Sequence, residues 1–354
     1  MSSEMPLEPI IEPELPIVDA HHHLFFLPEA TLVALEGDDS IYSRSIAPLL
    51  RQHARYLFDE FCSDTRAGHN VRASVFVECH AMYRVDGPEA MQSVGEVEFA
   101  NGVAAMAASG LFGDVRVCAG IVGSVDLRLG GHVEEILRAH IQAGGGRYRG
   151  VRWAGAYHDE DSRIAGADNG TPHLLLDSKF REGYAQLAPL GLSFDVFLLE
   201  PQIPDLIDLA CAIPETQIVL NHVGGPLGVG RYAGQREERF SLWSRHIKAL
   251  SRCTNVAVKL GGLGLPFGGF NSYRASPPYN SEQLAGEWRP YIEACIEAFG
   301  VDRCMFESNF PVDAAVGTYR VLWNAFKRLL AGASRVEKTA LFSGTATRIY
   351  RLEL

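Results

Sequence analysis

Near its N-terminus the chain reads Ile17-Val18-Asp19-Ala20-His21-His22-His23-Leu24, an apolar run that ends in three consecutive histidines. The apolar start predicts a short β-strand. Because side chains alternate along a strand, His21 and His23 lie on one face and His22 lies on the other. Two imidazoles on one face can bind a divalent metal ion or hold a carbonyl oxygen, whereas a histidine cluster that only caps the strand is the alternative.

Seven further apolar runs follow, and helical patterns separate them. They cover residues 71–78, 115–122, 148–153, 192–199, 217–222, 256–260 and 304–309. Short apolar strands that alternate with helices are typical of a parallel sheet covered by helices. Eight strands in this order predict an α/β protein with a (β/α)₈ TIM barrel, which a helical segment at residues 336–354 completes.

Two connections are too long for simple turns. Residues 24–70 follow the first strand and contain a helical pattern at residues 48–61, which predicts a helical insertion. Residues 261–281 follow the seventh strand and form a long loop rich in Gly, Pro and aromatic residues. Both connections follow the carboxyl ends of strands, where the active sites of such barrels lie. The long loop either covers the site as a lid or only packs against the barrel mouth.

Length and composition predict a single domain at residues 17–354, after a leader at residues 1–16 that is rich in Glu and Pro. The net charge of −11 lacks the basic excess that nucleic-acid binding requires. No apolar run approaches the roughly 18 residues of a membrane helix. Seven scattered cysteines fit reduced thiols. We therefore expect a cytoplasmic protein that binds a small-molecule substrate, neither nucleic acid nor a membrane, with a homo-oligomer as a possible state.

Two later strands also end in polar residues. The sixth strand ends at His222, which can complete a metal site, polarise a carbonyl group or act as an acid or base, or can be a structural histidine. On the eighth strand, Glu307 and Asn309 are two positions apart and are expected on the inward face. A carboxylate buried near histidines needs a cation, a proton or a polar partner, so Glu307 is either functional or paired with Arg or backbone groups.

Four motifs in this order resemble those of the amidohydrolase-2 family. They are His-x-His at 21–23, Asn-His-Val-Gly at 221–224, Lys-Leu-Gly-Gly at 259–262 and Met-Phe-Glu-Ser-Asn-Phe-Pro at 305–311. The resemblance runs from about Ile17 to Leu352 and is specifically to the branch of metal-dependent TIM-barrel hydrolases that includes sugar lactonases and 2-pyrone-4,6-dicarboxylate hydrolase. It implies an amidohydrolase-type barrel and an enzyme that hydrolyses a carbonyl compound.

The resemblance also implies roles for individual residues. His21 and His23 match the metal-binding pair of the first strand, and His222 matches the histidine that orients the substrate carbonyl or takes part in catalysis. Asn309 stands where the family usually has an Asp that binds metal and activates water, and a neutral amide cannot be a general base. We therefore predict that Glu307 supplies the carboxylate and that Asn309 positions the water. One divalent ion, zinc by its nitrogen ligands, is expected at His21, His23, His222 and Glu307, although the histidines could also hold a carbonyl oxygen without metal.

Other polar residues near strand ends are predicted to bind the substrate, namely Glu78, Tyr83, Arg84, Arg152 and Lys259. The cations among them suit a substrate carboxylate, and salt bridges at the rim are the alternative. The preferred function is hydrolysis of a cyclic ester. A non-oxidative decarboxylase and a non-catalytic ligand-binding barrel are the alternatives. In each case His21 and His222 should lie within about 15 Å of each other at one end of the barrel.

Overall fold

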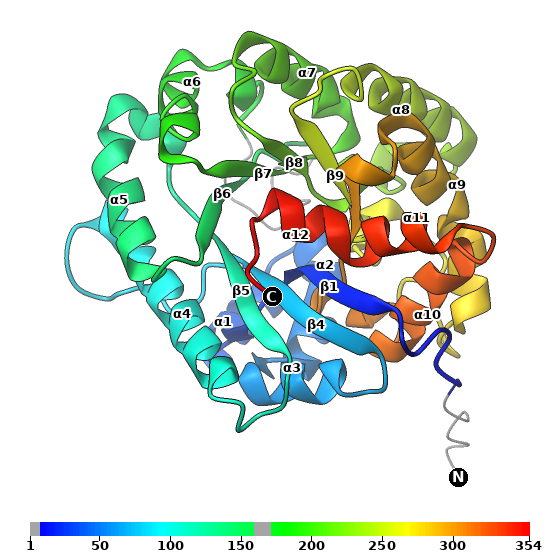
Figure 1. The fold of residues 1–354 in the computed structure, drawn as a ribbon. Helices are drawn as coiled ribbons and strands as arrows, with labels where there is room; N and C mark the ends of the chain where they lie inside the picture. The colour runs from blue at the N-terminus through cyan, green and yellow to red at the C-terminus, as the bar shows by residue number, and fades with distance from the viewer. Residues whose placement is uncertain (1–7, 159–170) are drawn as a thin grey trace.

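Eight parallel strands surround the centre of the structure, a computed structural model that describes residues 8–158 and 171–354 (Figure 1). In chain order, which is also their order in the sheet, the strands are β1 (Pro16–His22), β4 (Asn70–Val77), β5 (Arg116–Gly123), β6 (Tyr148–Ala154), β7 (Ser193–Phe197), β8 (Ile218–Leu220), β9 (Val256–Leu260) and β10 (Cys304–Phe306). Apolar residues fill both faces of these strands because the sheet is covered on both sides. The predicted α/β barrel architecture is confirmed.

The first and last strands close the barrel. The backbone of His23 donates to the carbonyl of Phe310 at 2.8 Å, and that of Asn309 donates to the carbonyl of His21 at 2.9 Å. The buried Asp19 carboxylate accepts from the backbone N–H of Ser308 at 2.8 Å and from its hydroxyl at 2.6 Å. These bonds fix the position of β10 against β1, and therefore the position of the polar residues that follow both strands.

Helices cover the outside of the barrel (Figure 1). Those between successive strands are α4 (Val94–Ala108), α5 (Val133–Ala143), α6 (Ser178–Tyr184), α7 (Ile203–Ala212), α8 (Arg236–Leu250) and α9 (Ser281–Phe299). After β10 come α10 (Tyr319–Leu329), α11 (Arg335–Thr339), a π-helical turn (Ala340–Gly344) and α12 (Thr345–Ile349). Local sequence sets helix ends: Asn280 and Gln283 form a capping box at the start of α9, and Gly300 follows its end with φ 75°.

The insertion after β1 is helical, as predicted, but the extent of its helices differs from the sequence pattern. It contains α1 (Glu29–Glu36), α2 (Ile41–Gln52) and α3 (Phe58–Thr65), with β2 (Phe25–Phe26) and β3 (Arg55–Tyr56) paired antiparallel. The helical pattern predicted at residues 48–61 is divided between the end of α2 at Gln52 and the start of α3 at Phe58, with β3 between them. The backbone of Leu27 donates to the carbonyl of Ala54 at 2.7 Å. Pairing with a segment distant in sequence has overridden the local helical pattern.

The long connection after β9 packs against the barrel mouth. Leu265 and Phe267 are buried in an apolar cluster with Phe197 and Leu199, which follow or end β7, and with Leu227. Phe267 and Phe197 have ring centroids 5.8 Å apart. Of the two possibilities for this loop, the structure therefore supports packing at the mouth.

The C-terminal segment fills the other end of the barrel. Tyr350 and Leu352 pack against small strand residues that point into the barrel, among them Val75 and Ala257. In Figure 1, α12 crosses the barrel opening beside the C-terminus. Among the helices that the structure describes, none has the length and apolar character needed to cross a membrane.

Candidate active site

The predicted histidines meet at the carboxyl ends of the strands. The ring centroids of His21 and His222 are 4.8 Å apart, well inside the expected limit, and those of His21 and His23 are also 4.8 Å apart. All three side chains are buried. His22 points to the opposite face, where its ring stacks on Phe61 at 4.0 Å. The alternation predicted for His21, His22 and His23 is confirmed.

Hydrogen bonds indicate where the first two rings carry their protons. His23 Nδ1 donates to the carbonyl of Val77 at 2.9 Å, so His23 Nε2 keeps a lone pair. His21 Nε2 is 3.1 Å from this atom, so with both rings neutral and no cation between them His21 Nε2 is the nitrogen that donates. His21 Nδ1 therefore keeps a lone pair, and Lys259 Nζ lies 3.3 Å away from it. Burial, followed by the charge of Lys259, lowers the pKa of His21 well below its ordinary range, so the ring is neutral at pH 7.

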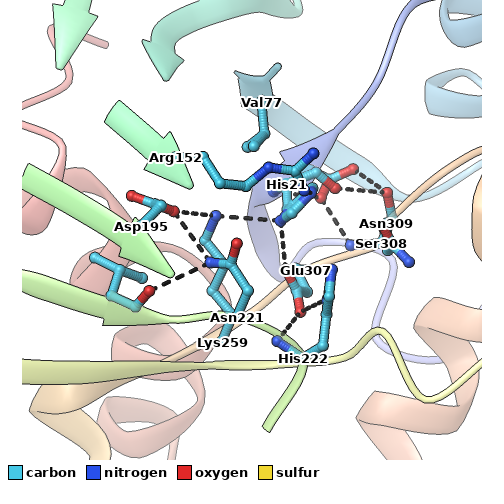
Figure 2. A network of polar contacts seen from close by, with 12 residues as sticks. His21, Val77, Arg152, Asp195, Asn221, His222, Lys259, Glu307, Ser308 and Asn309 are labelled. Carbon is cyan, nitrogen blue, oxygen red and sulfur yellow. Dashed lines mark hydrogen bonds and ion pairs between the residues drawn. The ribbon is translucent and has the colours of Figure 1, made fainter. Parts of the chain in front are cut away.

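Glu307 lies between His21 and His222 (Figure 2). Its Oε1 accepts from the backbone N–H of His222 at 3.1 Å and from His222 Nδ1 at 2.8 Å. Its Oε2 is buried, has no hydrogen-bond partner among the described residues, and lies 2.9 Å from His21 Nδ1. An anionic oxygen and a lone pair repel each other at this distance unless a proton or a cation lies near both.

The same residues offer ligands for one metal ion. His21, His222 and Glu307 each provide a ligand atom, and these atoms lie within 4.8 Å of one another. Zinc commonly binds imidazole nitrogens and carboxylate oxygens. Glu307 Oε2 has no hydrogen-bond donor among the described residues, so it is available as a ligand. The donor set therefore fits a divalent cation. His23 Nε2 lies 3.1 Å from His21 Nε2, where it can orient His21, and its predicted role as a further ligand stays a prediction.

Two cations flank His21, and each already has an anionic partner. Lys259 Nζ is fully buried and lies 2.8 Å from Asp195 Oδ2. Arg152 Nε donates to Glu78 Oε1 at 2.6 Å, and its NH1 group is 3.4 Å from His21 Nε2. Burial would raise the pKa of Glu78, but the charge of Arg152 lowers it overall, so this carboxylate is ionised.

Tyr83 and Arg84, two predicted substrate-binding residues that follow β4, differ in their exposure to solvent. Tyr83 is half-buried, and its ring centroid is 5.8 Å from that of His80, whose Nε2 is 3.6 Å from Glu78. Arg84 is different: its side chain is 44% exposed and forms an ion pair with Glu98 on the surface. Arg84 therefore has a surface partner, and its predicted contact with the substrate stays a prediction.

Asn309 faces Asp313 after β10. The amide of Asn309 donates to Asp313 Oδ1 at 2.7 Å. Alternation does not fix the direction of Asn309, because β10 ends at Phe306 and Asn309 has a left-handed backbone with φ 52°. Burial, with a further contribution from the charge of Glu307, raises the pKa of Asp313 to about 8. Burial therefore favours the protonated form of Asp313 at neutral pH, which makes it a poor general base there.

The sequence did not predict three residues of the site, namely Asp195, Asn221 and Tyr350. Asp195 Oδ2 accepts from Lys259, from the hydroxyl of Tyr350 at 2.7 Å and from the amide of Asn221 at 3.2 Å. The acidic residue inside an apolar strand was the available signal for Asp195, since a buried carboxylate requires partners. Tyr350 gave no such signal, because it reaches the site from the C-terminal segment inside the barrel.

The Lys-Leu-Gly-Gly motif has a steric explanation. A Cβ atom at Gly262, where φ is +64°, would lie 2.0 Å from His222 Nδ1, and one at Gly261 would lie 2.5 Å from Glu307.

We expect Gly262→Ala to lower the free energy of unfolding by about 1–3 kcal/mol through overpacking. Gly286→Ala in α9 is the matched control, because its Cβ would meet open space. Urea unfolding of both variants tests this, and equal stabilities would contradict it.

Glu96, a buried carboxyl group close enough to Glu78 to be affected by its charge, should make the stability of the fold depend on pH. Glu96 Oε1 accepts from the backbone N–H groups of Cys79 at 2.9 Å and Ala81 at 2.8 Å. Burial, followed by the charge of Glu78, raises the pKa of Glu96 from 4.5 to about 8. The unfolded chain loses this proton at lower pH than the folded chain, so Glu96 makes stability fall between about pH 4.5 and pH 8.

Glu96→Gln keeps the shape of the side chain and removes the ionisation. We therefore expect the stability of the variant relative to the wild-type protein to be higher at pH 8 than at pH 5. Urea unfolding at the two pH values measures this difference. The same relative stability at both would show that Glu96 does not keep its proton in the folded protein.

Comparisons with known proteins identify the family of this chain. The amidohydrolase family model matches residues 18–352. The chain is 31% identical to the uncharacterised protein y4mH of Sinorhizobium fredii over 96% of this chain and 99% of that protein. It is 29% identical to an L-fucono-1,5-lactonase of Burkholderia multivorans over 50% of this chain and 57% of that protein.

Among solved structures, an amidohydrolase from Burkholderia multivorans with bound zinc superposes with a TM-score of 0.70 at 24% identity, covering 95% of this chain and 99% of that one. At this identity the likeness concerns the fold. The family match, in contrast, extends over nearly all of the chain, including β1 from Val18 onward and the residues after β10. The protein belongs to the amidohydrolase family.

Proposed function

We propose that this protein hydrolyses a cyclic ester and that one divalent cation, with zinc as the expected ion, is held by His21 Nδ1 and Glu307 Oε2 beside His222. The observation that carries the proposal is the buried Glu307 Oε2, which has no hydrogen-bond partner among the described residues and faces the lone pair of His21 Nδ1 at 2.9 Å. The zinc in the structurally similar amidohydrolase and the lactonase activity of a relative support it. When bound, such an ion polarises a carbonyl oxygen and makes water easier to deprotonate.

His222 is the proposed proton carrier. Its Nδ1 proton is held by Glu307 Oε1 at 2.8 Å, which leaves Nε2 as the nitrogen that can accept a proton. A carboxylate that orients an imidazole in this way also stabilises the ring when it becomes charged. His222 can thus take a proton from the attacking water and return it to the alkoxide that leaves when the ring opens. Glu307 then acts as the partner of His222, in place of the direct general base that the sequence indicated.

Arg152 is the proposed stabiliser of negative charge on the substrate. Its NH1 group lies 3.4 Å from His21 Nε2, and its side chain is 12% exposed, so it borders the histidine cluster. Charged donors placed where negative charge develops stabilise the transition state of ester hydrolysis. Lys259 is fully buried against Asp195, so its role is to keep His21 neutral.

Both cations beside His21 already have a carboxylate partner. Arg152 is paired with Glu78 and Lys259 with Asp195. Within the described part of the site, the proposed ion would balance the charge of Glu307. We therefore propose a neutral lactone in place of the carboxylate-bearing substrate that the sequence indicated.

Metal analysis and turnover together test the proposal. The protein, purified without added metal, should contain one equivalent of a divalent ion and hydrolyse members of a panel of neutral lactones. We expect His21→Asn to lose the ion and to lower kcat/KM by about 10² or more. His80→Gln, which changes an exposed histidine at the rim, is the control that should keep both.

Other outcomes would identify the alternatives. Release of carbon dioxide from aromatic acids without lactone turnover would show a decarboxylase. Ligand binding without turnover of either substrate class would show a non-catalytic barrel.

A further inference from the structure

Two cysteines meet at the end of the barrel opposite the histidines. Cys211 lies in the last turn of α7, and Cys253 lies between α8 and the start of β9. Their Sγ atoms are 3.6 Å apart. The seven cysteines all lie in the described part of the chain and are all free thiols. The close pair joins segments that are 42 positions apart in the sequence.

Solvent reaches this pair from one side. Cys211 is exposed and Cys253 is 8% exposed. A surface cavity of about 370 Å³ is lined by both cysteines and by Arg252 and Pro214. A small oxidant can therefore approach Cys211 first. Arg252 lines the cavity, and Arg303 donates to the Cys253 carbonyl at 3.0 Å. Burial raises the pKa of Cys253, so Cys211 is the thiol expected to react first.

The geometry allows a bond between the two sulfur atoms. A disulfide requires a separation of about 2.05 Å, so the atoms must approach by about 1.5 Å. Cys211 is followed by the end of α7 at Ala212, and Cys253 follows the end of α8 at Leu250. Residues at the ends of helices can make such a shift more easily than residues inside them.

We propose that Cys211 and Cys253 form an oxidative modification site, in which a hydroperoxide converts the two thiols to an intramolecular disulfide. The Cys211 thiolate attacks one peroxide oxygen, the O–O bond breaks, and a sulfenic acid and water form after protonation. The Cys253 sulfur then attacks Sγ of Cys211 and displaces the hydroxyl group, which leaves as a second water. Two thiols are oxidised by two electrons, and hydrogen peroxide is reduced to two waters.

The disulfide should change stability. It would tie α7 to the segment that enters β9 and close a long loop in the unfolded chain, which restricts the unfolded state. We therefore expect oxidation to raise Tm by a few degrees. This inference is independent of the proposed function, because the pair lies near the amino end of β9 and no substrate is required to test it.

The experiment uses the full chain with hydrogen peroxide as the probe. After mild oxidation and alkylation, peptide mass spectrometry without reduction should find a peptide linked through Cys211 and Cys253. Titration of the denatured protein should lose two of its seven thiols, and dithiothreitol should restore them. Cys211→Ser and Cys253→Ser should each abolish the linked peptide and the rise in Tm.

Cys295→Ser is the matched control. Cys295 is fully buried, and the thiol of Cys304 contacts its carbonyl oxygen at 3.6 Å, so this variant should still form the 211–253 link. Oxidation of Cys211 to a sulfinic acid without the linked peptide would overturn the proposal. So would a link that joins two chains, or a wild-type Tm that oxidation leaves unchanged.

Discussion

Glu307→Gln should lower kcat by about 10³ while the protein stays folded, a loss comparable to that of removing the group that orients a catalytic histidine. Glu307 Oε1 holds the Nδ1 proton of His222, and Oε2 faces the lone pair of His21. An amide offers one acceptor and presents N–H donors at its other end. The variant therefore cannot bind a cation through Oε2 and hold the His222 proton through Oε1 as the carboxylate does.

The loss should appear in metal content as well as in turnover. The measurement compares lactone turnover, bound metal per chain and Tm for the wild-type protein and the variant. Glu200→Gln is the matched control, because Glu200 is also fully buried but pairs with Arg239 on α8. It should keep both turnover and metal. If Glu307→Gln retained full turnover and only lowered Tm, Glu307 would be a structural residue and the proposed roles of His21 and His222 would need another partner.

Lys259→Met should lower the free energy of unfolding by about 3–5 kcal/mol, the cost of leaving one member of a buried ion pair without its partner. Lys259 Nζ and Asp195 Oδ2 are 2.8 Å apart, and both side chains are fully buried. The remaining carboxylate of Asp195 would keep two weaker partners, the hydroxyl of Tyr350 and the amide of Asn221. Asp195→Asn should be destabilising for the corresponding reason, because it leaves the ammonium group of Lys259 buried.

A double-mutant cycle separates this pair from general packing effects. The double variant, with Lys259→Met and Asp195→Asn, should lose less stability than the sum of the two single variants, because neither charge remains. Denaturant unfolding of the four proteins gives the coupling energy. Additive losses would show that the two charges do not stabilise each other. The pH dependence of turnover in Lys259→Met adds a second test, since removal of this cation should raise the pKa of His21.

The barrel and the position of the candidate site could be predicted from local sequence. Apolar runs alternating with helical patterns require a covered parallel sheet, and the carboxyl ends of its strands must lie at one end. Residues that end different strands, such as His21, His222 and Glu307, therefore had to come together. The alternation of His21, His22 and His23 followed from strand geometry alone. The helical pattern at residues 48–61 did not show its interruption by β3, because the strand that pairs with β3, β2, lies in a distant segment.

The protonation and pairing of these groups depended on tertiary structure. Distances between strands place Glu307 against His21 and His222 and pair Asp195 with Lys259. Burial raises the pKa of Asp313. Sequence spacing determines which face of a strand a side chain occupies, but electrostatic energies change steeply with separation and with exclusion of water. Only the folded barrel fixes the separation of these groups and their exclusion from water. The tertiary structure therefore decides which histidines and carboxylates donate, accept or form ion pairs.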